Sequence, residues 1–266
     1  MSKINRAIYE IEHMSQLAHR DQWVNNIHPL VKLFISFFYI LTVVSFGKYN
    51  LTGIMSMALY PIFSFAVCEL SWRDALYRLR LVIPLVCIVG IFNPLFDRQI
   101  VTYIGNLAVS GGFISMLSLM IKGILTVLAS YILIATTPIE RICYALRLLH
   151  VPKIFVTEIM LIFRYIVVLL EEVRKLTQAY SLRAPGQKGI HFKAWGSLTG
   201  QLLLRSMDRA ELVYESMCLR GYKGEYTFSM RSTVKVKDIL YGLVWAGIFA
   251  LLRLFPVFDI VGGLFV

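Results

Sequence analysis

The sequence predicts an all-α, polytopic membrane protein with about five transmembrane helices and three amphipathic helices in the cytoplasm. Of its 266 residues, 58% are hydrophobic and only 16% are charged, whereas soluble domains are about 45–50% apolar and about 25% charged. The apolar residues gather into runs, and the net charge of +11 gathers between them. This composition excludes an ordinary soluble enzyme, a disordered chain and a disulfide-stabilised scaffold.

Five apolar runs predict the membrane crossings. A bilayer core of about 30 Å needs about 20 mostly apolar helical residues. Residues 1–28 are polar, lack a secretory signal and are expected to stay in the cytoplasm. Four crossings are predicted within 29–135 and a last one, with a short tail, within 238–266: 29–46, 51–68, 81–96, 113–135 and 239–255. Pro84 and the Asn93-Pro94 pair predict a bent or partly unwound third crossing.

The positions of Lys and Arg predict the orientation. With the amino terminus inside, the outer segments carry Lys48 and Arg98, and Arg253 lies at the outer end of the last crossing. The inner segments carry many more: Lys3, Arg6, Arg20, then Arg73, Arg78 and Arg80 in the loop after the second crossing, and sixteen Lys or Arg within 138–237. Because cytoplasmic loops are rich in Lys and Arg, we expect a multi-pass protein of the cell membrane with a cytoplasmic amino terminus.

Residues 138–237 form a segment that is too long to be a structureless connection. Its pattern predicts three amphipathic helices, at 139–149, 153–182 and 195–219. Val151-Pro152, Ala184-Pro185-Gly186 and Gly221 end them in turn. A single basic amphipathic helix often only binds anionic lipid, at about 1 kcal/mol per Lys or Arg, or pairs its own charges at i,i+4. Three in series favour a docking domain.

The second and third of these helices end in the same way, Leu182-Arg183-Ala184 and Leu219-Arg220-Gly221, called here the two Arg tails. One explanation is that each Arg complements the helix dipole, which is worth about 0.3–1 kcal/mol. The repetition suggests instead that each tail offers a guanidinium to a carboxylate, because the planar fork of Arg can hold a carboxylate by two parallel hydrogen bonds.

Motifs for chemistry within the chain are missing from the sequence. Without a G-x-x-x-x-G-K-[ST] loop the chain is not expected to hydrolyse ATP, and neither a nucleophile elbow nor a paired-carboxylate constellation appears. The five histidines and four isolated cysteines have no metal-ligand spacing. Lys122, a charge within the fourth crossing, is either functional or reaches toward the membrane surface. We therefore expect a non-catalytic subunit whose partner supplies ATP.

The chain resembles the transmembrane T component of energy-coupling-factor (ECF) transporters, closest to the cobalt-type branch. The resemblance runs from about Asn26 to Tyr222. Its motifs, in order, are Asn26-Ile27-His28-Pro29-Leu30-Val31-Lys32, Phe92-Asn93-Pro94-Leu95-Phe96-Asp97, Ala135-Thr136-Thr137-Pro138, Leu149-His150-Val151-Pro152, Phe163-Arg164-Tyr165, Leu204-Arg205-Ser206-Met207-Asp208-Arg209-Ala210-Glu211 and the two Arg tails. The family's tails are often Ala-Arg-Gly, so the arginines match while their flanking residues vary.

The resemblance implies a division of labour among subunits. Two cytosolic ATPase subunits bind ATP and Mg²⁺, and the T component transmits their closure to a small membrane S component that holds the substrate. The tails carrying Arg183 and Arg220 would dock in the two ATPases. The charged residues of the matched motifs would support these coupling helices: Arg164, Arg205, Asp208, Arg209 and Glu211. No cofactor, metal or nucleic acid is then expected on this chain.

The resemblance also implies a substrate, which in the cobalt-type branch is Co²⁺ for cobalamin synthesis, held by the partner. Nickel, or a vitamin delivered through a shared module, stays open. Two other classes compete with the coupling subunit. A self-sufficient secondary transporter would need inverted repeats and ionisable residues at mid-membrane, and a membrane-embedded enzyme would need an acid–base or metal cluster.

Overall fold

The structure, a computed structural model, describes residues 3–96, 100–104, 107–187, 189–224 and 233–254. These residues form ten α-helices, one 3-10 turn (η1, Val24–Asn26) and one two-stranded hairpin. They divide into two compact units. The basic unit comprises residues 1–17 and 139–231, and the apolar unit comprises 18–138 and 232–266. Asp97, the end of the last predicted crossing with its tail (255–266), and residues 225–232 of the predicted 138–237 segment lie outside the described residues.

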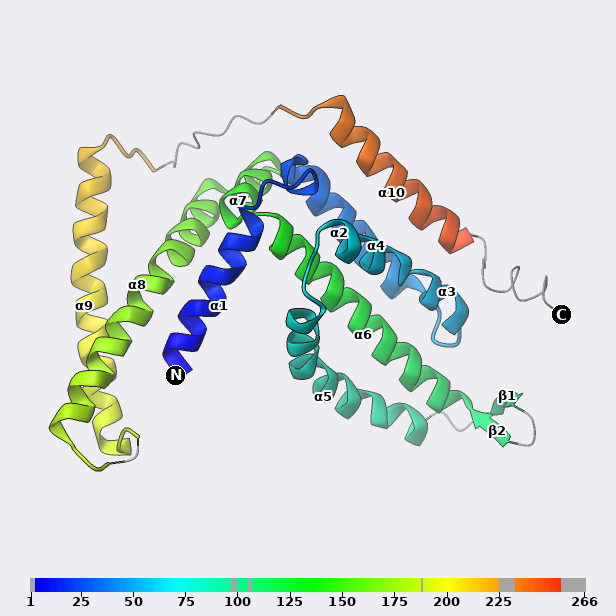
Figure 1. The fold of residues 1–266 in the computed structure, drawn as a ribbon, viewed down its shortest axis with the longest axis horizontal. Helices are drawn as coiled ribbons and strands as arrows, with labels where there is room; N and C mark the ends of the chain where they lie inside the picture. The colour runs from blue at the N-terminus through cyan, green and yellow to red at the C-terminus, as the bar shows by residue number, and fades with distance from the viewer. Residues whose placement is uncertain (1–2, 97–99, 105–106, 188, 225–232, 255–266) are drawn as a thin grey trace. The chain divides into compact units, whose positions relative to one another are not determined.

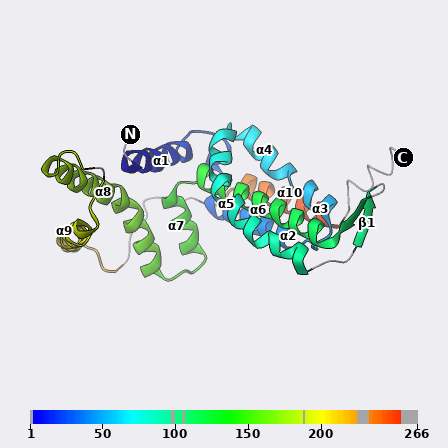
Figure 2. The same cartoon turned by 90° about the horizontal axis from the view of Figure 1, so that it is seen from below.

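The apolar unit is built around one long helix. Its elements are α2 (Pro29–Ser45), α3 (Leu51–Ser56), α4 (Leu59–Val67), α5 (Trp72–Phe96), β1 (Ile100–Ile104), β2 (Leu107–Ser110), α6 (Gly111–Thr136) and α10 (Val236–Leu254). Helix α6 contacts α2, α3, α4 and α5, and Figures 1 and 2 show α5 and α6 side by side. The antiparallel hairpin between them pairs Ile100 with Ser110 and was not predicted.

Side-chain caps fix where several of these helices begin. Nδ1 of His28 accepts a hydrogen bond from the Leu30 amide at 3.3 Å, and Pro29 occupies the first turn of α2. The Asn50 side chain accepts from the Gly53 amide at 3.0 Å at the start of α3. Such caps satisfy amides that have no partner within a helix. They explain why the apolar runs begin where the sequence predicts.

The second predicted crossing is broken rather than continuous. Helices α3 and α4 are separated at Met57 and Ala58. A continuous helix would need the amide of residue 61 to donate to the Met57 carbonyl, but Pro61 has no amide hydrogen. The Tyr39 hydroxyl of α2 donates to that carbonyl instead, at 2.9 Å. The break is therefore stabilised by a side chain from another helix, which the pattern of hydrophobic residues does not reveal.

The third predicted crossing is bent, as predicted, but it begins earlier than expected. Helix α5 starts at Trp72, so Arg73, Arg78 and Arg80 lie on its first turns and not in a loop. Its two arms, Trp72–Arg80 and Val82–Pro94, meet at 48°. The ring of Pro84 explains the position of the bend, because a proline clashes with the carbonyl four residues earlier and leaves it without a donor.

One of these arginines, Arg78, contacts an aromatic ring of α6. Arg78 lies 4.7 Å from the ring centroid of Tyr131 on α6, so its charge is placed on an aromatic face.

Among the described helices, α6 alone is long and apolar enough to cross a bilayer, and α5 joins it if its two bent arms count as one span. Helices α2 and α3–α4 are apolar but shorter.

An aromatic cluster forms the centre of the apolar unit. Tyr39 and Phe249 are fully buried, with ring centroids 5.2 Å apart. Tyr60 packs at 4.7 Å from Tyr39 and at 4.9 Å from Trp245. Aromatic pairs at these distances contribute about 0.5–1.5 kcal/mol beyond the area that they bury. The cluster joins α2, α4 and α10, and so attaches the carboxyl-terminal helix to the rest of the unit.

The basic unit contains α1 (Lys3–Ala18), α7 (Ile139–Leu148), α8 (Lys153–Arg183) and α9 (Phe192–Leu219). The last three confirm the three helices predicted between residues 139 and 219. Helix α9 begins three residues earlier than predicted, where Nδ1 of His191 accepts from the Lys193 amide. Helix α7 ends at Leu148, and two residues later His150, with a φ of +61°, turns the chain so that the Val151 amide donates to the Leu146 carbonyl at 3.2 Å.

Candidate functional site

The first Arg tail ends α8 on an ordered turn. Arg183 is the last residue of the helix, and the Ala184 amide donates to the Tyr180 carbonyl at 3.1 Å. The Tyr180 hydroxyl donates to Oε1 of Gln187 at 3.0 Å and accepts from the His191 amide at 3.3 Å. These bonds tie the following loop back to the helix. The tail is nonetheless open, because Leu182 is 76% exposed and Arg183 is exposed as well.

The second Arg tail ends α9 in a Schellman motif. The Tyr222 amide donates to the Met217 carbonyl, and the Gly221 amide to the Cys218 carbonyl, both at 2.9 Å. Gly221 has a φ of +84°, a conformation that is costly for residues with a Cβ. This confirms Gly221 as the end of the helix. Arg220 is the C-cap, and the preceding Leu219 is 90% exposed.

The two tails lie at opposite ends of the α8–α9 pair. Figure 1 shows α9 running back in the direction opposite to α8, so Arg183 lies beside the connecting loop and Arg220 lies at the far end. Because α9 has 28 residues at 1.5 Å each, the tails are about 40 Å apart along its axis. Neither guanidinium pairs with any residue that the structure describes. Two such sites suit two separate contacts and not one shared ligand.

Three of the five predicted supporting residues lie together in a groove between α8 and α9. Arg205 forms an ion pair with Glu172 of α8, and Asp208 and Arg209 line the groove beside it. The groove has a volume of about 330 Å³. Arg164 on α8 and Glu211 on α9 are exposed and do not line it. Exposed ion pairs are worth about 0–1 kcal/mol, so this pair adds little to the stability of the contact between α8 and α9.

Helix α9 exposes a row of apolar side chains. It buries no residue within the described chain. Leu203, Met207 and Tyr214 are each about 60% exposed, and their spacing of four and seven residues places them on one side of the helix. This apolar side of α9, next to charged residues such as Arg205 and Asp208, is the amphipathic pattern predicted for the helix.

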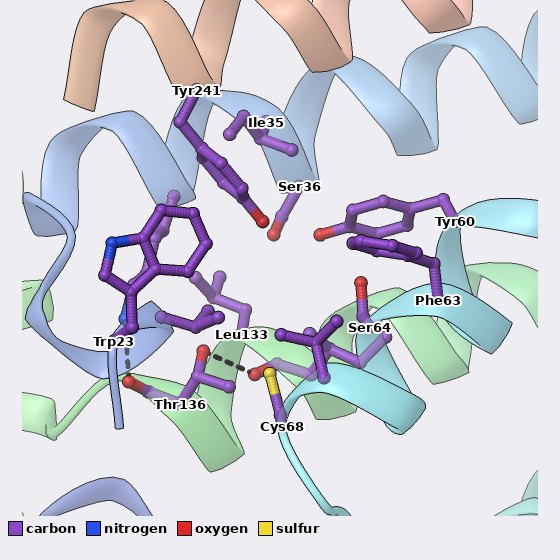
Figure 3. A pocket seen from close by; sticks show the side chains of 14 residues that line it. Trp23, Ile35, Ser36, Tyr60, Phe63, Ser64, Cys68, Leu133, Thr136 and Tyr241 are labelled. Carbon is purple, nitrogen blue, oxygen red and sulfur yellow. Dashed lines mark hydrogen bonds between the residues drawn. The ribbon is translucent and has the colours of Figure 1, made fainter. Parts of the chain in front are cut away.

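The apolar unit holds a small cavity with a few hydroxyls in a mostly apolar lining, shown in Figure 3. Its volume is about 30 Å³, enough for one water molecule. The hydroxyls of Ser36, Tyr60 and Tyr241 point toward one another in it, with Ser64 beside them. Its lining contains no carboxylate and no imidazole, and its single thiol, that of Cys68, is one ligand where a bound ion needs several. Since divalent cobalt and nickel prefer imidazole, carboxylate or thiolate ligands, this cavity does not fit such an ion.

Three cations within the apolar unit cap helix ends. The ammonium of Lys122 on α6 donates to the carbonyls of Phe46 at 2.5 Å and Val44 at 3.3 Å, at the end of α2. Arg253 of α10 donates to the Ser45 carbonyl at 3.0 Å and lies 4.3 Å from the ring centroid of Phe46. Cations at helix carboxyl ends are favourable because the carbonyls there lack amide partners.

Lys32 on α2 does the same for α6. It is 6% exposed and its ammonium donates to the Thr136 carbonyl at 2.8 Å. Thr136 is the last residue of α6, just before Thr137-Pro138 lead into the basic unit. The sequence motif that contains Lys32 did not predict this capping role; the signal that could have indicated it is a lysine in the first turns of an otherwise apolar helix. In the described structure Lys32 and Lys122 therefore both cap helix ends.

No group of three or more His, Cys, Asp or Glu side chains among the described residues could hold a metal ion. The cysteines in that part of the chain are free thiols. Cys143 on α7 is fully buried, and burial, with a smaller effect of Glu140, raises the pKa of its thiol to about 11. Cys218, two residues before Arg220, is exposed.

Comparisons with known proteins agree with these observations. The uncharacterized protein MJ1571 of Methanocaldococcus jannaschii is 33% identical over 122 residues, which are 45% of this chain and 42% of that protein. The nickel permease LarQ of Lactiplantibacillus plantarum is 27% identical over 40% of this chain and 38% of its own length. The putative fused cobalt transport protein CbiMQ of Methanocorpusculum labreanum is 30% identical over 35% of this chain and 16% of its own length.

These alignments each span about two fifths or less of the relative's length. A much longer match comes from a protein family described as cobalt transport protein, which aligns with residues 20–230. That range covers η1, helices α2 to α9 and both Arg tails. The chain therefore belongs to the CbiQ family of cobalt transport proteins.

Proposed function

We propose that this chain is the transmembrane coupling subunit of an ECF-type importer for cobalt ions. In this role it transmits the ATP-driven closure of two cytosolic ATPase subunits to a small membrane S component that binds the substrate. The chain itself is not catalytic and carries neither ATP nor the metal. Membership of a cobalt transport family supports a transport role.

The observation that carries the proposal is the pair of exposed Arg tails. Arg183 and Arg220 each follow an exposed leucine at the end of a long helix, and their guanidiniums are unpaired within the described chain. The distance between them, about 40 Å along α9, allows one ATPase subunit at each tail. A charge-assisted contact that is desolvated on docking typically costs about 2–5 kcal/mol when one partner is removed.

The relatives support a multi-component importer. The name of the M. labreanum protein describes a fusion, which favours a chain of this kind working beside a second component. The name of LarQ gives nickel as its substrate, so nickel is the alternative to cobalt. Neither relative is matched over most of its length, and the substrate is therefore part of the proposal.

We further propose five crossings, formed by α2, by α3 with α4, by α5, by α6 and by α10, with the amino terminus in the cytoplasm. The helix caps support placing these helix ends near the two membrane surfaces, and the orientation itself rests on the Lys and Arg of the loops. Lys122 and Arg253 meet at the end of α2 that the proposal places outside, and Lys32 at the end of α6 that it places inside. Charged side chains near helix ends can reach toward a membrane surface.

The test reverses the charge at both tails. Arg183→Glu combined with Arg220→Glu is expected to abolish recovery of the ATPase subunits with the tagged chain and ATP-dependent uptake of radioactive cobalt, while membrane insertion persists. The matched control is Arg174→Glu combined with Lys223→Glu, which changes the same charge at exposed positions of α8 and just beyond α9. If the tail variant still recovers the ATPases and supports uptake, the proposed contacts are wrong.

A further inference from the structure

An apolar groove runs along the outside of the apolar unit between α2 and α10. Its volume is about 410 Å³, and its walls carry almost only carbon atoms: Val31, Phe34 and Phe38 from α2, and Ile239, Ala246 and Phe249 from α10. Phe34, Phe38 and Ile239 are each about half exposed. Gly242 lets α2 and α10 approach closely along the groove, because a Cβ there would lie 3.0 Å from Cγ1 of Val31.

The length of the groove matches one leaflet of a bilayer. From Ile239 to Phe249 is ten residues of helix, or about 15 Å, and the hydrocarbon core is about 30 Å thick. Trp23 lies at one end of the unit, 64% exposed, with its ring edge-to-face on Tyr241 at 5.8 Å. Tryptophan and tyrosine favour the interface between lipid and water. The groove therefore starts at an interface and ends near the middle of the core.

The end of the groove at this interface is positively charged. Lys235 immediately precedes α10, and its carbonyl accepts from the amides of Asp238 at 2.9 Å and Ile239 at 3.3 Å, so its backbone lies at the amino-terminal end of the groove. Lys237 is in the first turn, and both lysines are exposed. The Asp238 carboxylate accepts from the Lys235 amide at 3.0 Å and so caps the helix. The amino-terminal dipole of α10 adds to the attraction for an anion.

From this geometry we infer that the groove binds an anionic phospholipid, with one acyl chain along α2 and α10 and the phosphate beside Lys235 and Lys237. The apolar walls match the chain, the length matches one leaflet, and the charge matches the headgroup. In the proposed orientation this lipid belongs to the cytoplasmic leaflet, where anionic lipids attract basic residues. The inference rests on the proposed placement of α2 and α10 in the bilayer, and it does not depend on the Arg tails.

Native mass spectrometry of the purified full chain, titrated with phosphatidylglycerol and with phosphatidylcholine, tests the inference. We expect one phosphatidylglycerol to bind more tightly than phosphatidylcholine. Ala246→Phe fills the groove and is expected to weaken this binding at least tenfold. Gly247→Phe, the control on the neighbouring residue, adds a ring where nothing lies within 4 Å of the Cβ and is expected to leave it unchanged.

The headgroup is tested by a variant that does not alter packing. Lys235→Gln with Lys237→Gln is expected to weaken phosphatidylglycerol about fivefold per lysine and to leave phosphatidylcholine unchanged. The inference would be overturned if phosphatidylglycerol bound equally well to the wild type and to Ala246→Phe. It would also be overturned if Ala246→Phe lost a membrane protein partner and still bound the lipid. Recovery of ATPase subunits should not change in any of these variants, so a failure here is distinct from a failure of the proposed coupling role.

Discussion

Replacing Tyr39 with phenylalanine tests why the second apolar run breaks into two helices. The hydroxyl of Tyr39 donates to the Met57 carbonyl at 2.9 Å, and both residues are fully buried. A buried carbonyl left without its partner typically costs about 1–3 kcal/mol. The Tyr60 amide also approaches this carbonyl, but at 3.4 Å, so part of the loss is offset. We therefore expect Tyr39→Phe to lower the free energy of unfolding by about 1–2 kcal/mol.

A second substitution distinguishes the loss of the hydrogen bond to the Met57 carbonyl from other effects of removing the hydroxyl, because it restores the amide donor that Pro61 lacks. Pro61→Ala returns an amide hydrogen that can reach the Met57 carbonyl, so Tyr39→Phe should cost less than half as much in the Pro61→Ala background. The measurement is unfolding in mixed detergent micelles, followed by the fluorescence of the tryptophans, arranged as a double-mutant cycle. Tyr77→Phe, at an exposed position of α5, is the control and should change stability by less than about 0.5 kcal/mol.

Two results would refute this reasoning. One is a cost for Tyr39→Phe that is no larger than that of the control. The other is an equal cost with and without Pro61, which would show that the hydroxyl does not compensate for the missing amide.

Three further predictions concern helix ends and thiols. Lys122→Met removes the cap on the Phe46 carbonyl, and it should lower the free energy of unfolding by about 1–3 kcal/mol while cobalt uptake persists. Loss of uptake at unchanged stability would instead give Lys122 a role in transport. The thiol of Cys218 should react with a maleimide at pH 7.5 at least about 100-fold faster than that of Cys143, because the thiolate is the reactive form and burial raises the pKa of Cys143 to about 11. Mass spectrometry of labelled peptides measures both rates, and similar rates would contradict the burial of Cys143. Gly221→Ala should cost about 1–2 kcal/mol at a φ of +84° and weaken ATPase recovery, whereas Gly196→Ala within α9 should not weaken it.

Hydrophobic patterning predicted the apolar runs and the three helices of the basic unit because these depend on local sequence. The end of α9 and the bend of α5 were predicted correctly because each depends on one residue and its own helix. Gly221 ends α9 through its own backbone conformation, and Pro84 bends α5 through a clash within the same helix. The start of α5 at Trp72 was missed since Arg73, Arg78 and Arg80 read as a loop. One of these charges, Arg78, is placed on the ring of Tyr131 in α6, a contact between distant segments.

The parts of the site that sequence could not reveal all depend on contacts across helices. Both Arg tails were found from the repeated Leu-Arg pattern, but their separation follows from the reversal of α9 against α8. The caps by Lys32 and Lys122 join residues 104 and 76 positions apart in the chain. A single sequence gives no measure of which helix lies opposite, so Lys122 could only be described as a charge at membrane depth.

The coupling role is tested most directly by purifying the tagged chain from its native membranes in mild detergent and identifying what accompanies it by mass spectrometry. The proposal predicts two ATP-binding subunits, or two copies of one, together with a small membrane protein, all present in stoichiometric amounts. Recovery of the chain alone, at good yield and still able to take up cobalt in liposomes, would contradict it and would favour a self-sufficient transporter.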